Sequence, residues 1–155
     1  MSGQRDNLIG QEFTTTSAEE TEEVGEKCAN RWTEPLAVAL VGPLGSGKTT
    51  FTRGLLRGKG GDVDLARSPT FTLINRYENT TPTLIHADLY RAPEVQAQET
   101  IGLEEYFDRA LVVVEWAGRW KLGWPDRTCT VSFEYSGQSG RKITVLEGPP
   151  DATGN

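Results

Sequence analysis

The sequence predicts an α/β fold with a mainly parallel central sheet and antiparallel additions. Residues 36–41 (LAVALV) are a continuous apolar run of strand length, typical of a strand covered on both faces, and residues 111–116 (LVVVEW) indicate another buried strand. Helix-forming segments alternate with such strands, which favours a parallel core. The length of 155 residues fits one domain with one core.

An amphipathic helix follows a short predicted strand around residues 11–16. Ser17 and Glu20 have the spacing of a capping box, which marks the start of a helix. Apolar side chains then recur every four positions on one helical face, at Val24, Cys28 and Trp32. Pro35 ends this helix before the first apolar strand.

The later elements follow from local pattern. A helix is expected at residues 48–57, stopped by a cluster of glycines. Alternation predicts strands at 71–78 and 84–87, and helical stretches follow within 94–108. After the apolar strand at 111–116, two closing strands at 128–135 and 141–147 are joined by a hairpin signal, SGQSG.

Composition narrows the class of protein. The net charge of −6 argues against a protein that grips nucleic acid mainly through its phosphates. The chain lacks a long apolar run and an apolar N-terminal signal, so we expect a cytoplasmic protein with no membrane contact. We expect a flexible tail at residues 1–12, one domain at 13–147 and a C-terminal tail at 148–155.

The loop GPLGSGKT, residues 42–49, satisfies the pattern G-x-x-x-x-G-K-[ST] at every position and lies between a strand and a helix. Such a loop turns bare backbone N–H groups toward phosphate oxygens, and the helix that follows adds its own unpaired donors. We therefore predict a P-loop NTPase-like three-layer sandwich. The predicted nucleotide-binding residues are Gly42, Leu44, Gly45, Ser46, Gly47, Lys48, Thr49 and Thr50.

A P-loop enzyme also needs a carboxylate near Mg²⁺, usually at the end of a neighbouring strand. Asp88 and Glu115 each end a predicted strand, so both are candidates for that carboxyl edge of the sheet. Glu115 could instead orient the attacking water, and either residue could be an ordinary strand terminus or turn. We predict catalytic roles for Lys48, Asp88 and Glu115, and metal ligation by Thr49, Glu115 and Asp88. His86, the single histidine, is more typical of a hydrogen-bonded interior residue than of a catalytic base.

Five stretches of the sequence, of which the P-loop is the first, occur in an order that is typical of one protein family. The stretches GPLGSGKTTFTRG, SPTFTLINRYE, HADLYR, GLEEYF and VVVEW resemble the bacterial TsaE (YjeE) family over residues 13–147. That resemblance implies a small ATPase that assists formation of threonylcarbamoyladenosine in tRNA. It implies ATP and Mg²⁺ as ligands, TsaB and TsaD as protein partners, and tRNA contact only through their complex.

The same resemblance implies roles for single positions. Ser68, Thr70 and Thr72 would belong to a switch-like loop, and Asp88 would hold the Walker B-like acidic position. Trp116 would lie near the site, and the nucleotide base would lie near residues 16–21. Two positions depart from the family pattern: Pro43 stands where the loop usually has aspartate, and Ala117 stands where proline usually follows the tryptophan.

Two further features leave alternatives open. Trp116, Trp120 and Trp124 recur every four residues and, if helical, would form an aromatic stripe for packing or for a partner protein. Arg91 could stabilise phosphate charge or form a structural ion pair, and Trp116 and Arg91 are candidate partner contacts.

Two other functions compete with an ATPase that serves a partner complex. A nucleotide-dependent binding module would bind ATP without turnover, and Pro43 is the residue that favours this alternative. A small-molecule P-loop kinase would need a lid and a substrate-binding insert, for which few residues remain.

Overall fold

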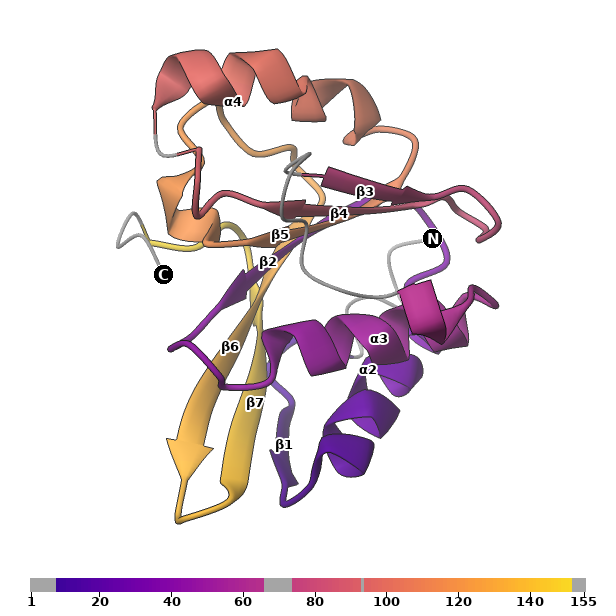
Figure 1. Ribbon diagram of the computed structural model, residues 1–155, viewed down its shortest axis with the longest axis vertical. Coiled ribbons are helices and arrows are strands. Elements are labelled where there is room, and N and C mark those ends of the chain that lie inside the picture. Colours follow the sequence, from indigo (N-terminus) through magenta and orange to yellow (C-terminus); the bar gives the residue numbers. More distant parts are fainter. Residues whose placement is uncertain (1–7, 66–73, 93, 152–155) are drawn as a thin grey trace.

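The computed structural model describes residues 8–65, 74–92 and 94–151 (Figure 1). Its strands and main helices are β1 (Glu12–Thr15), α2 (Ala18–Arg31), β2 (Leu36–Val41), α3 (Lys48–Gly58), β3 (Ile74–Tyr77), β4 (Leu84–Asp88), α4 (Val95–Ile101), β5 (Leu111–Glu115), β6 (Thr128–Ser136) and β7 (Gly140–Glu147). Short 3₁₀ turns are η1 (Val63–Leu65), η2 (Leu103–Tyr106) and η3 (Ala117–Arg119).

The strands form one mixed sheet in the order β1-β7-β6-β2-β5-β4-β3. At its centre β2 runs parallel to both β5 and β6, and β4 runs parallel to β5. The other three strands, β1, β3 and β7, pair antiparallel at the two sides. The expected α/β sheet with a parallel core and antiparallel additions is confirmed.

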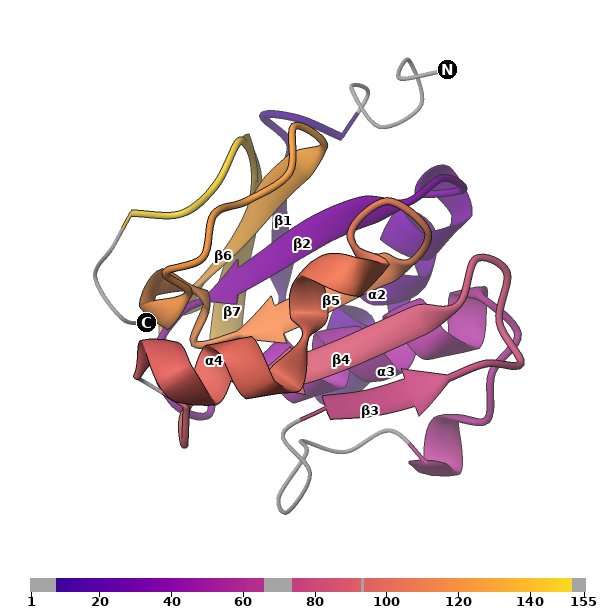
Figure 2. The ribbon, with the colours of Figure 1, turned by 90° about the horizontal axis from the view of Figure 1, so that it is seen from above.

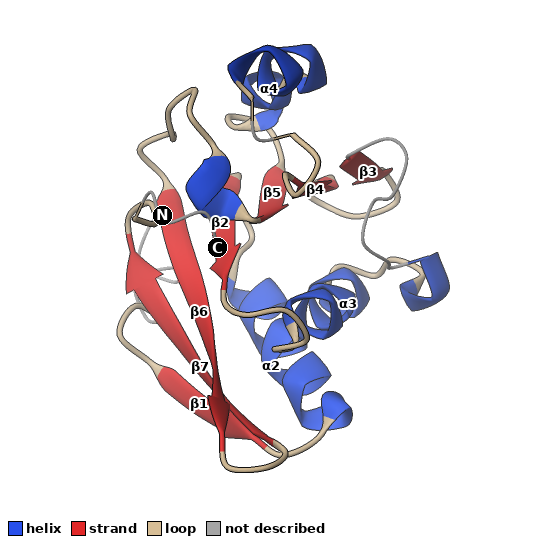
Figure 3. Ribbon diagram, turned by 60° about the vertical axis from the view of Figure 1, so that its left-hand side comes forward, coloured by secondary structure: helices blue, strands red, loops and turns tan. Residues whose placement is uncertain are grey.

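Helices cover both faces of this sheet, which gives three layers (Figures 2 and 3). Alternate residues of the central strands enter two separate cores, so that Leu84 packs on the side of α2 and α3 while Ile85 packs on the side of α4. Within the described residues, no helix is both long enough and apolar enough to span a bilayer.

The start of α2 follows the capping signal with one difference. The Ser17 hydroxyl accepts the backbone N–H of Glu20 at 3.1 Å, as a capping box requires. The Glu20 carboxylate, however, accepts from the N–H of Thr16 at 2.7 Å, one residue before the N-cap. The cap therefore ties the end of β1 to the start of α2, and this holds the segment that leads into the helix.

Helices α2 and α3 touch through their backbones because glycines face each other. A methyl carbon at Gly54 would lie 2.0 Å from the carbonyl oxygen of Glu22, and one at Gly25 would lie 2.2 Å from the carbonyl oxygen of Phe51. A side chain at either position would force the helices apart. The close contact fixes α3, and with it the P-loop that precedes α3, against the N-terminal helix.

Gly54→Ala should lower the free energy of unfolding by about 3 kcal/mol, at the upper end of overpacking costs. Alanine would favour an isolated helix by about 1 kcal/mol over glycine, so any loss must come from the helix contact. Thermal unfolding should show a midpoint about 10 °C lower. Asn30→Ala, at an exposed position of α2, is the control and should leave the midpoint nearly unchanged. A Gly54→Ala midpoint as high as that of the unchanged protein would contradict this packing.

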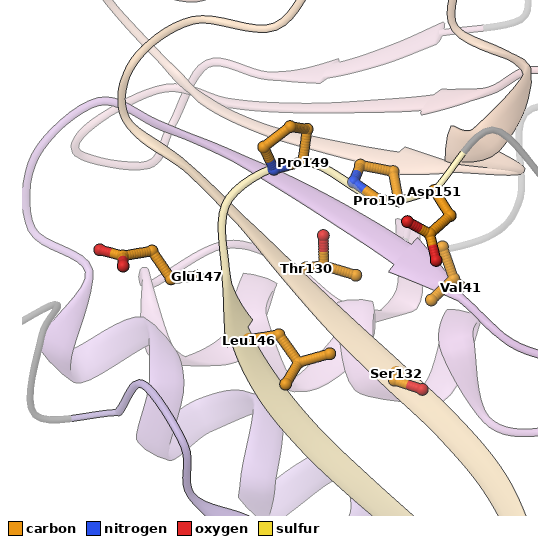
Figure 4. Close-up of a pocket in the computed structure, with 8 residues that line it drawn as sticks. All are labelled: Val41, Thr130, Ser132, Leu146, Glu147, Pro149, Pro150 and Asp151. Atoms are coloured by element: carbon orange, nitrogen blue, oxygen red, sulfur yellow. The ribbon is translucent and has the colours of Figure 1, made fainter.

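Packed structure extends past the expected domain boundaries at both ends. Leu8 is buried in the core beside α2, and the N–H of Gly10 donates to Val145 at 2.7 Å. After β7, Pro149, Pro150 and Asp151 line a cavity of about 250 Å³ over β6 and the end of β2 (Figure 4). The division into one domain at 13–147 with two tails stays a prediction.

Candidate nucleotide-binding site

The predicted loop connects β2 to α3 at the carboxyl end of the central strand. Gly47 is the N-cap of α3 with φ of 107°, a backbone conformation that side chains disfavour, and no side chain caps this helix end. A methyl carbon at Gly42 would lie 2.6 Å from the carbonyl oxygen of Phe133, so β6 holds this end of the loop closely. The helix therefore presents its first N–H groups to the loop, as an anion site requires.

Lys48 directs its ammonium back into the loop. Its Nζ donates to the Gly42 carbonyl at 2.6 Å, and the residue is only 5% exposed. Nζ also lies 5.4 Å from the centre of the Trp116 ring. The positive charge is thereby held at the mouth of the loop, where phosphate oxygens would need it.

The two predicted carboxylates lie side by side. Asp88, at the end of β4, is paired in register with Glu115, at the end of β5. Glu115 is also in register with Leu40 of β2, one residue before that strand ends. The Thr49 hydroxyl lies 3.4 Å from Glu115 Oε2, which joins the first turn of α3 to the carboxyl edge of the sheet.

Most of the predicted residues line one cavity of about 240 Å³. Its lining residues are Leu44, Gly45, Gly47, Lys48, Thr49, Thr50, Asp88, Glu115 and Trp116. Of the described loop residues that were predicted, Gly42 and Ser46 are not part of this lining: the Gly42 carbonyl accepts from Lys48, and Ser46 is fully buried. Pro43 is exposed, and its carbonyl accepts the N–H of Ser46 at 3.2 Å, so proline fits the first turn of the loop.

Burial and charge shift the acidity of the three ionisable groups in this cavity. Burial lowers the pKa of Lys48, while Glu115 and Asp88 oppose that shift. Burial raises the pKa of Asp88, although the N–H of Tyr90, which donates to Oδ1 at 2.9 Å, opposes the change. Burial would also raise the pKa of Glu115, but its interactions with His86 and the positive charge of Lys48 outweigh burial and lower it.

His86 is a fully buried partner of Glu115, with Nε2 2.6 Å from Oε2. The sequence favoured a hydrogen-bonded interior histidine, and the structure supplies its partner. That partner was not foreseen, because two residues 29 positions apart meet only through the alignment of β4 and β5.

Trp116 follows Glu115 in a strained conformation. With φ of 56° and ψ of 40° it is left-handed, which costs a non-glycine residue about 1–3 kcal/mol. Its ring lies 5.0 Å from Tyr90, and the Arg119 guanidinium lies 4.7 Å from its centre. The turn places the ring beside Lys48, so the expectation that Trp116 lies near the site agrees with the geometry.

The three tryptophans do not form one helical stripe. Only a single 3₁₀ turn, η3, follows Trp116, and Trp120 already has extended backbone. Trp120 and Trp124 instead gather around Phe107, at ring distances of 6.0 and 6.1 Å. Both pack against the α4 side of the sheet.

A second cavity of about 390 Å³ adjoins the loop on its other side. It is lined by the start of α2, by the loop and by the β6–β7 hairpin, through Thr16, Ser17, Ala18, Thr21, Gly45, Gly47, Thr50, Gln138, Ser139 and Arg141. The nucleotide base was expected near residues 16–21, and four residues of that range, Thr16, Ser17, Ala18 and Thr21, line this cavity.

The β6–β7 hairpin holds the loop from outside, a contact that local sequence did not predict. Tyr135 donates its hydroxyl to the Leu44 carbonyl, and Arg141 Nη2 donates to the Gly45 carbonyl at 3.2 Å. Tyr135 and Arg141 are cross-strand partners, and the guanidinium lies 4.8 Å from the ring centre.

The remaining predicted site residues are those of the switch-like loop and Arg91. Ser68, Thr70 and Thr72 lie outside the described residues, so their switch-like role stays a prediction. Arg91 is exposed, and within the described residues it does not belong to the lining of either cavity beside the loop.

Comparison with known proteins agrees with this geometry. The family model described as "Threonylcarbamoyl adenosine biosynthesis protein TsaE" matches residues 15–143. The tRNA threonylcarbamoyladenosine biosynthesis protein TsaE of Aquifex aeolicus is 34% identical over 137 residues, which are 86% of this chain and 94% of that protein. The corresponding Bacillus subtilis protein is 34% identical over 133 residues, 85% of this chain and 82% of that protein. The crystal structure of Bacillus subtilis YdiB superimposes with a TM-score of 0.72 at 30% identity, covering 89% of this chain and 86% of that one.

Proposed function

The chain belongs to the TsaE family of tRNA threonylcarbamoyladenosine biosynthesis proteins, and from this premise we propose that it binds and hydrolyses ATP with Mg²⁺. In this proposal, hydrolysis assists a complex of TsaB and TsaD in forming threonylcarbamoyladenosine next to the anticodon. The protein contacts tRNA only through that complex, and it acts in the cytoplasm. The observation that carries the proposal is the convergence of the loop, Lys48, Asp88 and Glu115 on one cavity.

Each part of the loop has a task in this proposal. Backbone N–H groups of residues 42–49 and of the first turn of α3 hold the phosphates. Lys48 bridges the outer phosphates, because its ammonium already lies inside the loop, 2.6 Å from the Gly42 carbonyl. Donors fixed before the reaction stabilise charge as it develops on the transferring phosphoryl group.

The donor set beside Lys48 suits Mg²⁺. The Thr49 hydroxyl and the Glu115 carboxylate are hard oxygen ligands 3.4 Å apart, and Asp88 lies in register with Glu115. Thr49 and Glu115 would hold the ion, with Asp88 close enough to act through a water. The ion would neutralise charge on the β- and γ-phosphates.

We place the adenosine end of the nucleotide in the second cavity, between the start of α2 and the β6–β7 hairpin. This cavity shares Gly45, Gly47 and Thr50 with the phosphate cavity, so one ligand can reach both. Arg141 lines it and holds the Gly45 carbonyl, which couples the hairpin to the loop.

Arg141→Ala should raise the dissociation constant for ATP about fivefold, in line with the loss of one partly exposed hydrogen bond worth about 1 kcal/mol. Calorimetric titration with ATP would measure it. Lys142→Ala is the matched control, because this neighbouring cation pairs with Glu12 on β1 and should leave ATP affinity unchanged. Equal losses in both variants would indicate a general charge effect and would contradict the proposed contact.

The function is tested by ATP turnover, measured alone and with purified TsaB and TsaD. We expect slow hydrolysis by the protein alone and faster hydrolysis when both partners are present. ATP binding without turnover, even with the partners, would instead identify a nucleotide-dependent binding module. Transfer of the phosphoryl group to a small-molecule acceptor would identify a kinase.

A further inference from the structure

Glu115 is held by a fully buried hydrogen bond to the single histidine of the chain. His86 has no exposed surface, and its Nε2 lies 2.6 Å from Glu115 Oε2. Because a carboxylate only accepts hydrogen bonds, it is the Nε2–H group that donates in this contact. The Thr49 hydroxyl approaches the same oxygen at 3.4 Å.

The sheet brings these side chains together by its register. His86 and Asp88 are two residues apart on β4, so they point to the same face, the face covered by α3. Asp88 is opposite Glu115, which makes His86 the diagonal neighbour of Glu115 across the strand pair. The Glu115 and His86 side chains are long enough to meet across this diagonal.

We propose that His86 is a positioning residue for the metal site, whose Nε2–H fixes the direction in which the Glu115 carboxylate faces Mg²⁺. This inference rests on the proposed function, since it assigns Glu115 to the ion. A buried bond from a rigid ring leaves the carboxylate little freedom to rotate. Such partners of metal ligands typically change metal affinity about 10–100-fold when they are removed.

The test compares two amide substitutions that differ by one methylene group. His86→Gln carries its amide nitrogen to about the place of Nε2 and should keep the bond, whereas His86→Asn is too short to reach Glu115. Mn²⁺ binding in the presence of ADP, followed by electron paramagnetic resonance, should weaken about 10–100-fold in His86→Asn and stay within about threefold of the unchanged protein in His86→Gln. ADP affinity in EDTA should be the same in all three proteins. Equal Mn²⁺ affinity in His86→Asn and the unchanged protein would overturn the inference.

A double substitution separates positioning from a general structural effect. In the Glu115→Ala background, His86→Asn should cause no further loss of Mn²⁺ affinity, because the carboxylate it positions is gone. A loss as large as in the single variant would overturn the inference. Failure of the unchanged protein to bind Mn²⁺ with ADP would be a different result, because it would overturn the proposed function itself.

The unchanged protein offers a readout that needs no substitution. Protein labelled with ¹⁵N-histidine gives the signals of one imidazole, because His86 is the only histidine. The Nε2–H signal should shift when Mg²⁺ is added to the ADP complex, and it should not shift when ADP is added in EDTA. A signal that stays unmoved once Mg²⁺ is bound would overturn the inference even if the His86 variants fail to fold.

Discussion

Lys48→Ala should abolish ATP turnover, with a loss of about 10³-fold, and should weaken ATP binding about 100-fold. Among the described residues that line the phosphate cavity, Lys48 is the one with a cationic side chain. Removing a charge-assisted contact costs about 3 kcal/mol of binding. Removing a donor that acts on the transition state lowers the rate about 10²–10³-fold. Lys48 contributes both to binding of the phosphates and to stabilisation of the transition state. Turnover assays and calorimetry with ATP measure the two effects.

Lys59→Ala is the control for this prediction. Lys59 follows the other end of α3, and its ammonium donates to the Trp32 carbonyl, far along the helix from the loop. Its loss should leave ATP affinity unchanged. Undiminished turnover in Lys48→Ala would contradict the proposed site, as would equal effects in the two lysine variants.

Glu115→Ala should separate hydrolysis from binding. The phosphates would keep the loop amides and Lys48, so ATP affinity should fall less than about tenfold, whereas hydrolysis should fall about 10²–10³-fold. The same assays would measure both values. Glu115→Gln keeps the shape of the side chain but not its charge, and it should lose hydrolysis to a similar extent.

Glu134→Ala, an exposed carboxylate on β6, is the control and should leave both values unchanged. If Glu115→Ala lost binding and hydrolysis to the same degree, the role given to this carboxylate would be wrong.

Local pattern was enough to predict most of the fold. The apolar runs became β2 and β5 at the centre of the sheet, and the glycine loop leads into α3 at Lys48 as expected. Asp88 and Glu115 could be placed together in advance, because parallel strands end at a common edge. These features depend on residues close in sequence or on one general rule of sheet geometry.

Other features depend on contacts between distant segments, and local sequence contains no signal for them. The bond between His86 and Glu115 depends on the register of β4 and β5. The hydrogen bonds of Tyr135 and Arg141 to the loop depend on the path of the β6–β7 hairpin. The tryptophan spacing suggested a helical stripe, but the left-handed turn at Trp116 breaks it. That turn carries Trp116 toward Lys48, and Trp120 is buried in the core on the α4 side of the sheet.

The most direct measurement is a crystal structure of the protein with Mg²⁺ and a non-hydrolysable ATP analogue. The proposed nucleotide site requires phosphates against the backbone of residues 42–49, the ion between Thr49 and Glu115, and the base beside residues 16–21. A triphosphate bound elsewhere on the molecule, or an ion that neither Thr49 nor Glu115 contacts, would contradict it.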